Sequence, residues 1–216
     1  MTRSIARAFA GTATSQGRVA RCSMKRALLL VVLVAAAVGC GSNAVSFSQP
    51  VDITLPALQS KSVSSGGALS TSKDVSTANG NPYGAFVTAA VQHLGGKNPS
   101  HIVVASLTLS MVTTPTGLTF DQVFSGTLAV NFVMNGSGNQ YSVGSIAGPT
   151  GAGPVSLTVA FNSASMTPAD YTGFLQGQFK VVIAGTATSG SSGFNNTNLT
   201  NETATIDATF GFIAYE

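Results

Sequence analysis

The chain contains few side chains that could carry acid–base, nucleophilic or metal chemistry. Its two histidines, His93 and His101, are eight residues apart across a Gly95-Gly96 turn. A zinc site needs three or four protein ligands, and neither an HExxH motif nor an acidic cluster accompanies these imidazoles. We therefore expect structural roles, with His93 near the C-terminal end of a helix and His101 at the rim of a sheet.

Serines and carboxylates do not suggest hydrolysis either. Gly136-Ser137-Gly138 and a similar tripeptide at 191–193 are typical of turns, not of a nucleophile elbow between a strand and a helix. Glycosidases place two carboxylates across one cleft. The candidate carboxylates instead stand apart in the chain, at Asp121, Asp170 and Asp207. The sequence predicts that the protein is not an enzyme, and a hydrolase is the least favoured alternative.

Cysteine occurs only twice, at Cys22 and Cys40, and both positions lie early in the chain. Between them a basic pair precedes an uninterrupted apolar run, 27–38, which ends in small residues. The run is shorter than the roughly 20 residues that a membrane-spanning helix needs. A basic start, a short apolar core and a small-residue end together predict a signal peptide over residues 24–39.

The end of this run, Ala37-Val38-Gly39-Cys40, resembles the lipobox of bacterial lipoproteins, whose cysteine is acylated and becomes the first residue after cleavage. Gly39 and Cys40 match that pattern, and Ala37 stands where leucine is the commonest residue. The resemblance covers only the export segment. It implies that Cys40 is the lipidation site and that a lipid bilayer is a partner of the protein. The alternative is ordinary secretory cleavage near Ala37, with Cys40 left as a free thiol.

Residues on either side of the predicted signal peptide bear on where the protein is located and where its chain starts. In the lipoprotein family an acidic residue after the cysteine favours the inner membrane, and Gly41-Ser42 carries none, so the resemblance implies the outer membrane of a bacterial cell envelope. Residues 1–23 are rich in arginine and precede a second methionine, Met24. We interpret them as a dispensable extension or a mis-assigned start. An organelle transit peptide is the alternative, but it leaves the lipobox unexplained.

Removal of the leader reverses the charge of the chain. The precursor has a net charge of +3, but six of its ten Lys and Arg residues lie within 1–26. From residue 40 onward four lysines accompany seven carboxylates, which gives a net charge of −3. No basic patch is then expected that could neutralise phosphates, so nucleic acid is not predicted as a partner. With one cysteine left, we expect no disulfide, no cysteine-bound metal and no cofactor.

Alternating apolar and polar residues dominate 40–216 and predict strands with one buried and one wet face. One buried row is expected to comprise Val103, Ala105, Leu107, Leu109 and Met111, and further rows are expected over 45–55, 124–134, 155–161, 179–185 and 204–212, with a short strand over 141–146. Pro50 lacks an amide hydrogen and places the first strand at a sheet edge or a bulge. The Ser, Thr and Gly-rich stretch 59–80 predicts a mobile loop.

Two short helices are expected, over 81–94 and 167–176, because each begins with a cap residue followed by proline and ends at glycine. The lack of a helix between each pair of strands excludes a βαβ architecture. We therefore predict a single domain over 40–216 that is mostly β. The expected fold is an antiparallel β-sandwich, Ig-like or jelly-roll-like, with six to eight strands and one or two short helices.

Composition leaves two main functional hypotheses. The charged fraction is only 8%, and the wet rows carry mostly Ser, Thr, Asn and Gly. We favour a non-catalytic cell-envelope lipoprotein whose sandwich is a structural, adhesive or ligand-recognition module, with a protein or glycan as its partner. Its general pattern is similar to the Ig-like domains of bacterial surface lipoproteins. The alternative is a carrier of a lipid or other apolar molecule between the sheets, gated by the two aromatic-bearing helices.

Overall fold

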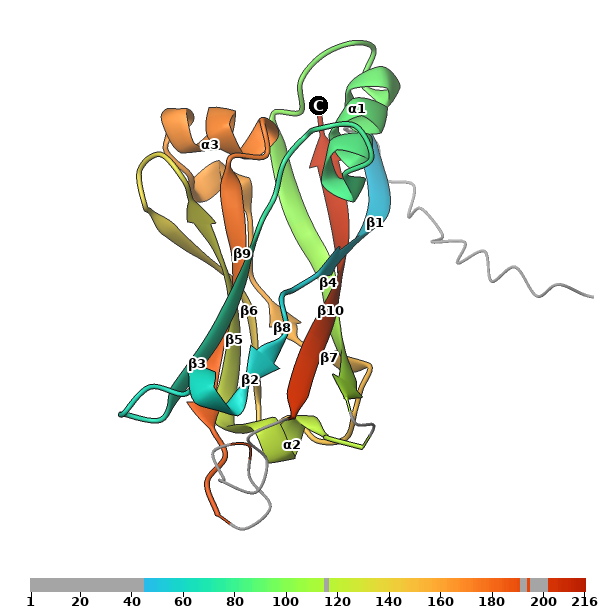
Figure 1. Ribbon diagram of the computed structural model, residues 1–216. Helices are drawn as coiled ribbons and strands as arrows, with labels where there is room; N and C mark the ends of the chain where they lie inside the picture. The colour runs from blue at the N-terminus through green and yellow to red at the C-terminus, as the bar shows by residue number, and fades with distance from the viewer. Residues whose placement is uncertain (1–44, 115–116, 191–193, 195–201) are drawn as a thin grey trace, which may run out of the picture. The chain divides into compact units, whose positions relative to one another are not determined.

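The computed structural model describes residues 45–114, 117–190, 194 and 202–216 and shows two antiparallel sheets that face each other (Figure 1). Sheet A has the strand order β1-β10-β4-β7, with β2 also paired to β10, and sheet B has the order β3-β9-β5-β6-β8. Sheet A contains β1 (Ser46–Thr54), β2 (Leu58–Gln59), β4 (His101–Thr114), β7 (Val155–Ser156) and β10 (Thr203–Tyr215). Sheet B contains β3 (Ala68–Asp74), β5 (Phe124–Met134), β6 (Gln140–Ala147), β8 (Thr158–Val159) and β9 (Phe179–Ala187). The predicted antiparallel β-sandwich is confirmed, but the described residues form ten strands, two more than the upper end of the predicted range of six to eight.

The two predicted helices are present with the predicted caps. The Asn81 side chain accepts a hydrogen bond from the first turn of α1 (Pro82–His93), and Thr167 does the same for α3 (Pro168–Leu175). These helices lie at the end of the sandwich where the chain reaches its C-terminus (Figure 1). The described residues also form three short helices that were not predicted from the sequence. These are the α-helix α2 (Phe120–Val123) and the 3₁₀ helices η1 (Ser60–Ser62) and η2 (Ser163–Ser165).

The stretch 59–80 differs from the predicted loop because it contains η1 and β3. All seven residues of β3 pair with β9, so this strand forms one edge of sheet B. Leu69 is its only buried residue, since an edge strand has few neighbours to cover it. Backbone pairing, not an apolar row, therefore holds β3 in place, and alternation in the sequence could not detect it.

The predicted inward row of β4 is wrong at its first two positions. Ile102 and Val104 are buried there, and Val103 faces outward. Pairing with β10 places Ser106 opposite Gly211 and Val104 opposite Phe212, so Ala105 is an extra residue in β4. Such a β-bulge interrupts the period of two, and the faces of the strand exchange across it.

The segment 155–161, predicted as one strand, passes from one sheet to the other. β7 pairs with β4 in sheet A, and β8 pairs with β6 in sheet B. Between β7 and β8, the Leu157 amide donates to the Leu107 carbonyl of sheet A at 2.9 Å. Just after β8, the Ala160 amide donates to the Val143 carbonyl of sheet B at 3.0 Å. This side of the sandwich is thus closed by continuous chain. On the other side, β1 is an edge strand, as Pro50 predicts.

Aromatic rings fill the space between the sheets near α1 and α3. Phe132 of β5 is central, with ring centroids 4.8 to 6.2 Å from five other phenylalanines: Phe161, Phe174, Phe179, Phe210 and Phe212. Tyr83 of α1 packs against the same group, and its hydroxyl donates to the Phe174 carbonyl of α3 at 3.0 Å. Burial raises the pKa of Tyr83 well above its ordinary value. We call this set of rings the aromatic cluster.

Gly84 and Gly173 provide a matched test of how closely the helices are packed. A Cβ at Gly84 would lie 2.8 Å from the Thr77 carbonyl oxygen, whereas a Cβ at Gly173 would meet only side-chain atoms, the terminal methyl of Met134 at 3.4 Å and Gln178 at 3.6 Å. We expect Gly84→Ala to lower the free energy of unfolding by about 1–2 kcal/mol, because backbone overpacking outweighs improved helix propensity. Gly173→Ala, measured by the same denaturant titration, should be neutral or stabilising, and equal losses in both variants would contradict this account.

Candidate functional site

Cys40, the residue to which the lipobox assigns acylation, lies outside the residues that the structure describes, as does the tripeptide at 191–193. The acylation of Cys40 therefore stays a prediction. Chain connectivity still relates it to the fold, because β1 begins at Ser46, six residues after Cys40. Among the described helices, none is long and apolar enough to cross a membrane.

The two histidines are held by aromatic neighbours and not by a common ligand. His101, the first residue of β4, stacks on Tyr215 of β10 with the ring planes 3° apart and the centroids 4.6 Å apart. His93, in the last turn of α1, lies 5.5 Å from the ring of Phe47 in β1. The structural roles expected for both residues fit these contacts. Within the described part of the chain, no group of three His, Cys, Asp or Glu side chains could hold a metal ion.

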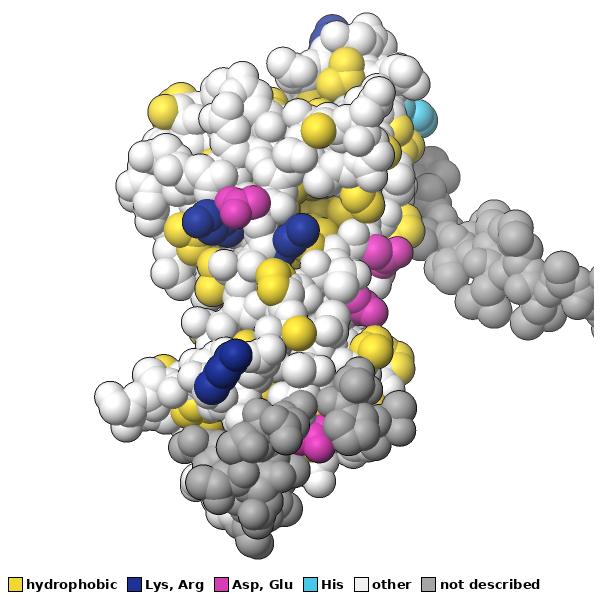
Figure 2. Space-filling model, viewed as in Figure 1, with side chains coloured by type: hydrophobic (Ala, Val, Ile, Leu, Met, Phe, Trp, Pro, Cys, Tyr) yellow, Lys and Arg dark blue, Asp and Glu magenta, His cyan; other side chains and the backbone are white. Residues whose placement is uncertain are grey.

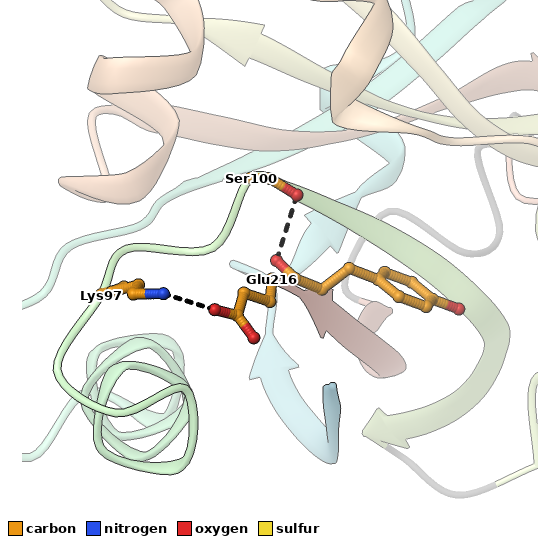
Figure 3. Close-up of polar contacts among 4 residues, drawn as sticks. Lys97, Ser100 and Glu216 are labelled. Atoms are coloured by element: carbon orange, nitrogen blue, oxygen red, sulfur yellow. Dashed lines mark hydrogen bonds and ion pairs between the residues drawn. The ribbon is translucent and has the colours of Figure 1, made fainter. Parts of the chain in front are cut away.

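The start of β1 and the end of β10 lie together at the α1 end of sheet A. The amide of Glu216 donates to the carbonyl of Val45 at 3.0 Å. Lys97, in the loop after α1, approaches the Glu216 carboxylate to 2.6 Å, and the Ser100 hydroxyl donates to the Tyr215 carbonyl at 3.3 Å (Figure 3). These contacts hold the loop after α1 against β10. They lie at the end of sheet A where β1 begins, shortly after Cys40 in the sequence.

Asp170 and Ser137, which the sequence analysis treated separately, are brought together. Asp170 is a buried residue, and its carboxylate accepts hydrogen bonds from the Ser137 hydroxyl at 2.6 Å, the Asn139 side-chain amide at 2.7 Å and the Tyr141 hydroxyl at 2.7 Å. Neither histidine is among these partners, so the cluster does not form a nucleophilic triad. It instead ties α3 to the turn between β5 and β6.

The hydrogen bonds to Asp170 determine its acidity. Donation from Ser137, then Asn139 and Tyr141, stabilises the carboxylate and lowers its pKa from 3.8 to about 2. A carboxylate held ionised in this way is a poor proton donor near neutral pH. The arrangement suits a structural anchor for the β5–β6 turn better than acid–base catalysis.

An open groove of 280 Å³ lies between the edge strands β1 and β3, lined by Asp52, Ile53, Thr54, Lys73, Asp74, Val75, Asn81 and Pro82. It brings carboxylates from both sheets to one opening, a proximity that no spacing in the sequence could reveal. Asp52 accepts a hydrogen bond from Thr209 at 2.6 Å, and Asp74 is 69% exposed and lies 4.0 Å from Lys180. Exposed and partnered carboxylates lack the low-dielectric surroundings that tune acid–base catalysts.

Charged side chains are sparse on the face that carries this groove. Figure 2 shows isolated lysines and carboxylates among mostly uncharged polar side chains, with small apolar patches between them. This pattern follows from the charged fraction of 8%. Such a surface offers hydroxyl and amide groups for hydrogen bonding but little long-range electrostatic attraction.

Asp170→Asn should weaken the fold at neutral pH, because an amide would place its own donors against the Ser137, Asn139 and Tyr141 donors. The folded-state pKa of about 2 lies below the ordinary 3.8, so the stabilisation is present above the ordinary value and is lost as pH falls toward 2. Thermal unfolding of wild-type protein should therefore show a decline in Tm between about pH 4 and pH 2 that is smaller in Asp170→Asn.

Asp52→Asn is the matched control for this pH series, because Asp52 is exposed and accepts a hydrogen bond from the Thr209 hydroxyl. It should retain nearly all of the stability at neutral pH and the acid dependence of the wild type. An Asp170→Asn variant as stable as Asp52→Asn, with an unchanged decline in acid, would remove the anchoring role from Asp170.

Comparison with known proteins assigns no family to this chain. No protein-family model matches it, and the search of curated proteins found no match. The residues and contacts described above are therefore the basis on which a function can be proposed.

Proposed function

We propose that the protein is a lipoprotein of the bacterial cell envelope, anchored in a membrane through acylated Cys40. The outer membrane is favoured over the inner membrane. The β-sandwich is then a non-catalytic structural, adhesive or ligand-recognition module. The observation that carries the proposal is the sequence Ala37-Val38-Gly39-Cys40 at the end of a short apolar run. One acyl chain gives only marginal membrane binding, so stable anchoring needs the multiple acylation that the lipobox resemblance implies.

The non-catalytic part of the proposal is supported by the described polar groups. Asp170 is saturated with hydrogen bonds, and His93 and His101 are both in contact with aromatic rings. Each of these residues has a structural partner, and none faces a second catalytic group. These contacts among the described residues support a role in binding or structure for the domain.

A contact surface is available on the outer face of sheet A. There the Thr54 hydroxyl donates to Asp207 and the Thr209 hydroxyl donates to Asp52, both at 2.6 Å across the β1–β10 pair. Neighbouring outward positions of β4 add Thr108 and Ser110. A flat row of hydroxyl and carboxylate groups suits hydrogen bonding to the hydroxyls of a glycan or to polar groups of a protein surface.

The contacts within the core do not favour the carrier hypothesis. The two helices that would gate a cavity contribute Tyr83, Phe86 and Phe174 to the aromatic cluster, and all three side chains have 0% exposure. Their rings lie against Phe212 and Phe179 with centroid distances of 4.7 to 5.6 Å. The rings thus occupy the space near α1 and α3 that a carried molecule would need.

Lipidation is tested by expressing the full chain in a bacterium fed an alkyne analogue of palmitate. We expect wild-type protein to incorporate the label, to sediment with membranes and to yield an N-terminal peptide that begins at acylated Cys40. Cys40→Ala should lose the label and leave the membrane fraction, because the acyl chains that are proposed to anchor the protein could no longer be attached.

Cys22→Ala is the matched control, since Cys22 is the other cysteine and precedes the apolar run. It should be labelled and fractionate like wild type. Unlabelled Cys40→Ala that still sediments with membranes, or labelling that requires Cys22, would contradict the proposed anchor.

A further inference from the structure

The outer face of sheet A changes in character from one end to the other. Its cross-strand pairs, taken from the α1 end, are His101 with Tyr215, Val103 with Ile213, Ser106 with Gly211, Thr108 with Thr209 and Ser110 with Asp207. Next to the start of β1, the side chains from β4 and β10 on this face are aromatic or aliphatic, and Ser46 and Ser48 of β1 lie beside them. The other half carries mostly hydroxyls and carboxylates, together with the exposed Val112. We call the first half the anchor-side patch and define it by His101, Val103, Ile213 and Tyr215.

The β-bulge at Ala105 determines which residues of β4 belong to this patch. Without the extra residue, the alternation that places Thr108 and Ser110 outward would continue to Val104 and Ile102, and Val103 would face the core. The bulge reverses the alternation, so that Ile102 and Val104 are buried while His101 and Val103 join the outer face. Val45, just before β1, is 42% exposed at the same end.

The length of chain before β1 limits where the patch can lie. Cys40 is five residues before Val45. Even fully extended, five residues span only about 18 Å. If Cys40 is acylated, as proposed above, Val45 is held within that short distance of the lipid anchor, and the anchor-side patch lies on the next two strands, β10 and β4, at the same end of sheet A.

Charge and side-chain type favour the same orientation. Asp52 of β1 and Asp207 of β10 are the outward carboxylates of these two strands, and both lie in the hydroxyl half of the face. Asp52 pairs with Thr209, which is about 20 Å from Tyr215 along β10 at the spacing of an extended strand. At the near end the Glu216 carboxylate is paired with Lys97. Tyrosine and aliphatic side chains are well suited to the membrane–water interface, where one end of a ring is apolar and the other is wet.

We propose that the anchor-side patch lies against the headgroup region of the bilayer, so that sheet A contacts the membrane and its hydroxyl half points away from it. This proposal rests on the proposed lipidation of Cys40 and specifies how the domain sits on its anchor. It assigns the patch to lipid, and it assigns contact with other partners to the far half of the face.

Single tryptophans can test this orientation because the chain contains none. Val103→Trp and Val112→Trp place the same reporter on the same strand, β4, and the same face, about 30 Å apart at the spacing of an extended strand. Each full-length variant is purified in its acylated form and reconstituted into phosphatidylethanolamine–phosphatidylglycerol vesicles that contain a lipid brominated near the acyl carbonyl. Tyr215→Trp serves as a second near-end reporter because it conserves an aromatic ring beside His101.

We expect quenching of Val103→Trp and Tyr215→Trp fluorescence by brominated lipid, and little quenching of Val112→Trp. Equal quenching at both ends, stronger quenching of Val112→Trp, or none at any position would overturn the proposed orientation. A blue-shifted, unquenched near-end tryptophan would assign the patch to a second copy of the protein and would also overturn it.

Flotation and intact mass separate failure of the orientation from failure of the anchor. Protein that carries acyl mass and floats with vesicles, but shows the wrong quenching pattern, retains the proposed function and loses only the orientation. Protein without acyl mass that does not float invalidates both. The double variant Cys40→Ala/Val103→Trp should remain unquenched, because the patch alone is too small to hold the domain on a bilayer.

Discussion

The aromatic cluster is the interaction on which the rest of the structure depends. Phe132 stands on the central strand of sheet B and contacts rings from β9, β10, α3 and the chain after β8. With only one cysteine expected after leader removal, no disulfide can link the sheets, and burial of these rings must supply much of the stabilisation. The same cluster positions both helices, because Tyr83 and Phe174 join it from α1 and α3.

Sequence patterns predicted the elements that bury a continuous apolar row. β10 alternates without interruption from Ala204 to Ala214, and the capped helices begin at the predicted residues. The patterns failed where another force determined the structure. β3 is held by backbone pairing with one buried side chain, and the face of Val103 is set by a bulge that only the partner strand reveals. Segment 155–161 alternates correctly yet divides between two sheets.

The candidate sites divide in the same way. Cys40 could be proposed from sequence because the lipobox that it resembles is a linear motif, which needs no fold to be complete. The Asp170 cluster could not, since Ser137 and Asp170 are 33 residues apart and meet only after β5, β6 and α3 have packed. Asp170 lies in the first turn of α3, where the helix dipole alone favours a carboxylate, so its position in the sequence does not point to its bonds with the β5–β6 turn.

The two long sides of the sandwich differ, and this difference would matter for a protein anchored to a membrane, as proposed above. One side is closed by the chain that passes from β7 to β8, whereas β1 and β3 leave edges on the other. Confinement to a bilayer raises lateral encounter rates between copies, and open strand edges would then invite edge-to-edge polymerisation. Pro50 removes a donor from β1, and Lys73 and Asp74 place charges on β3. These residues would keep a dense layer of neighbouring molecules separate and individually folded.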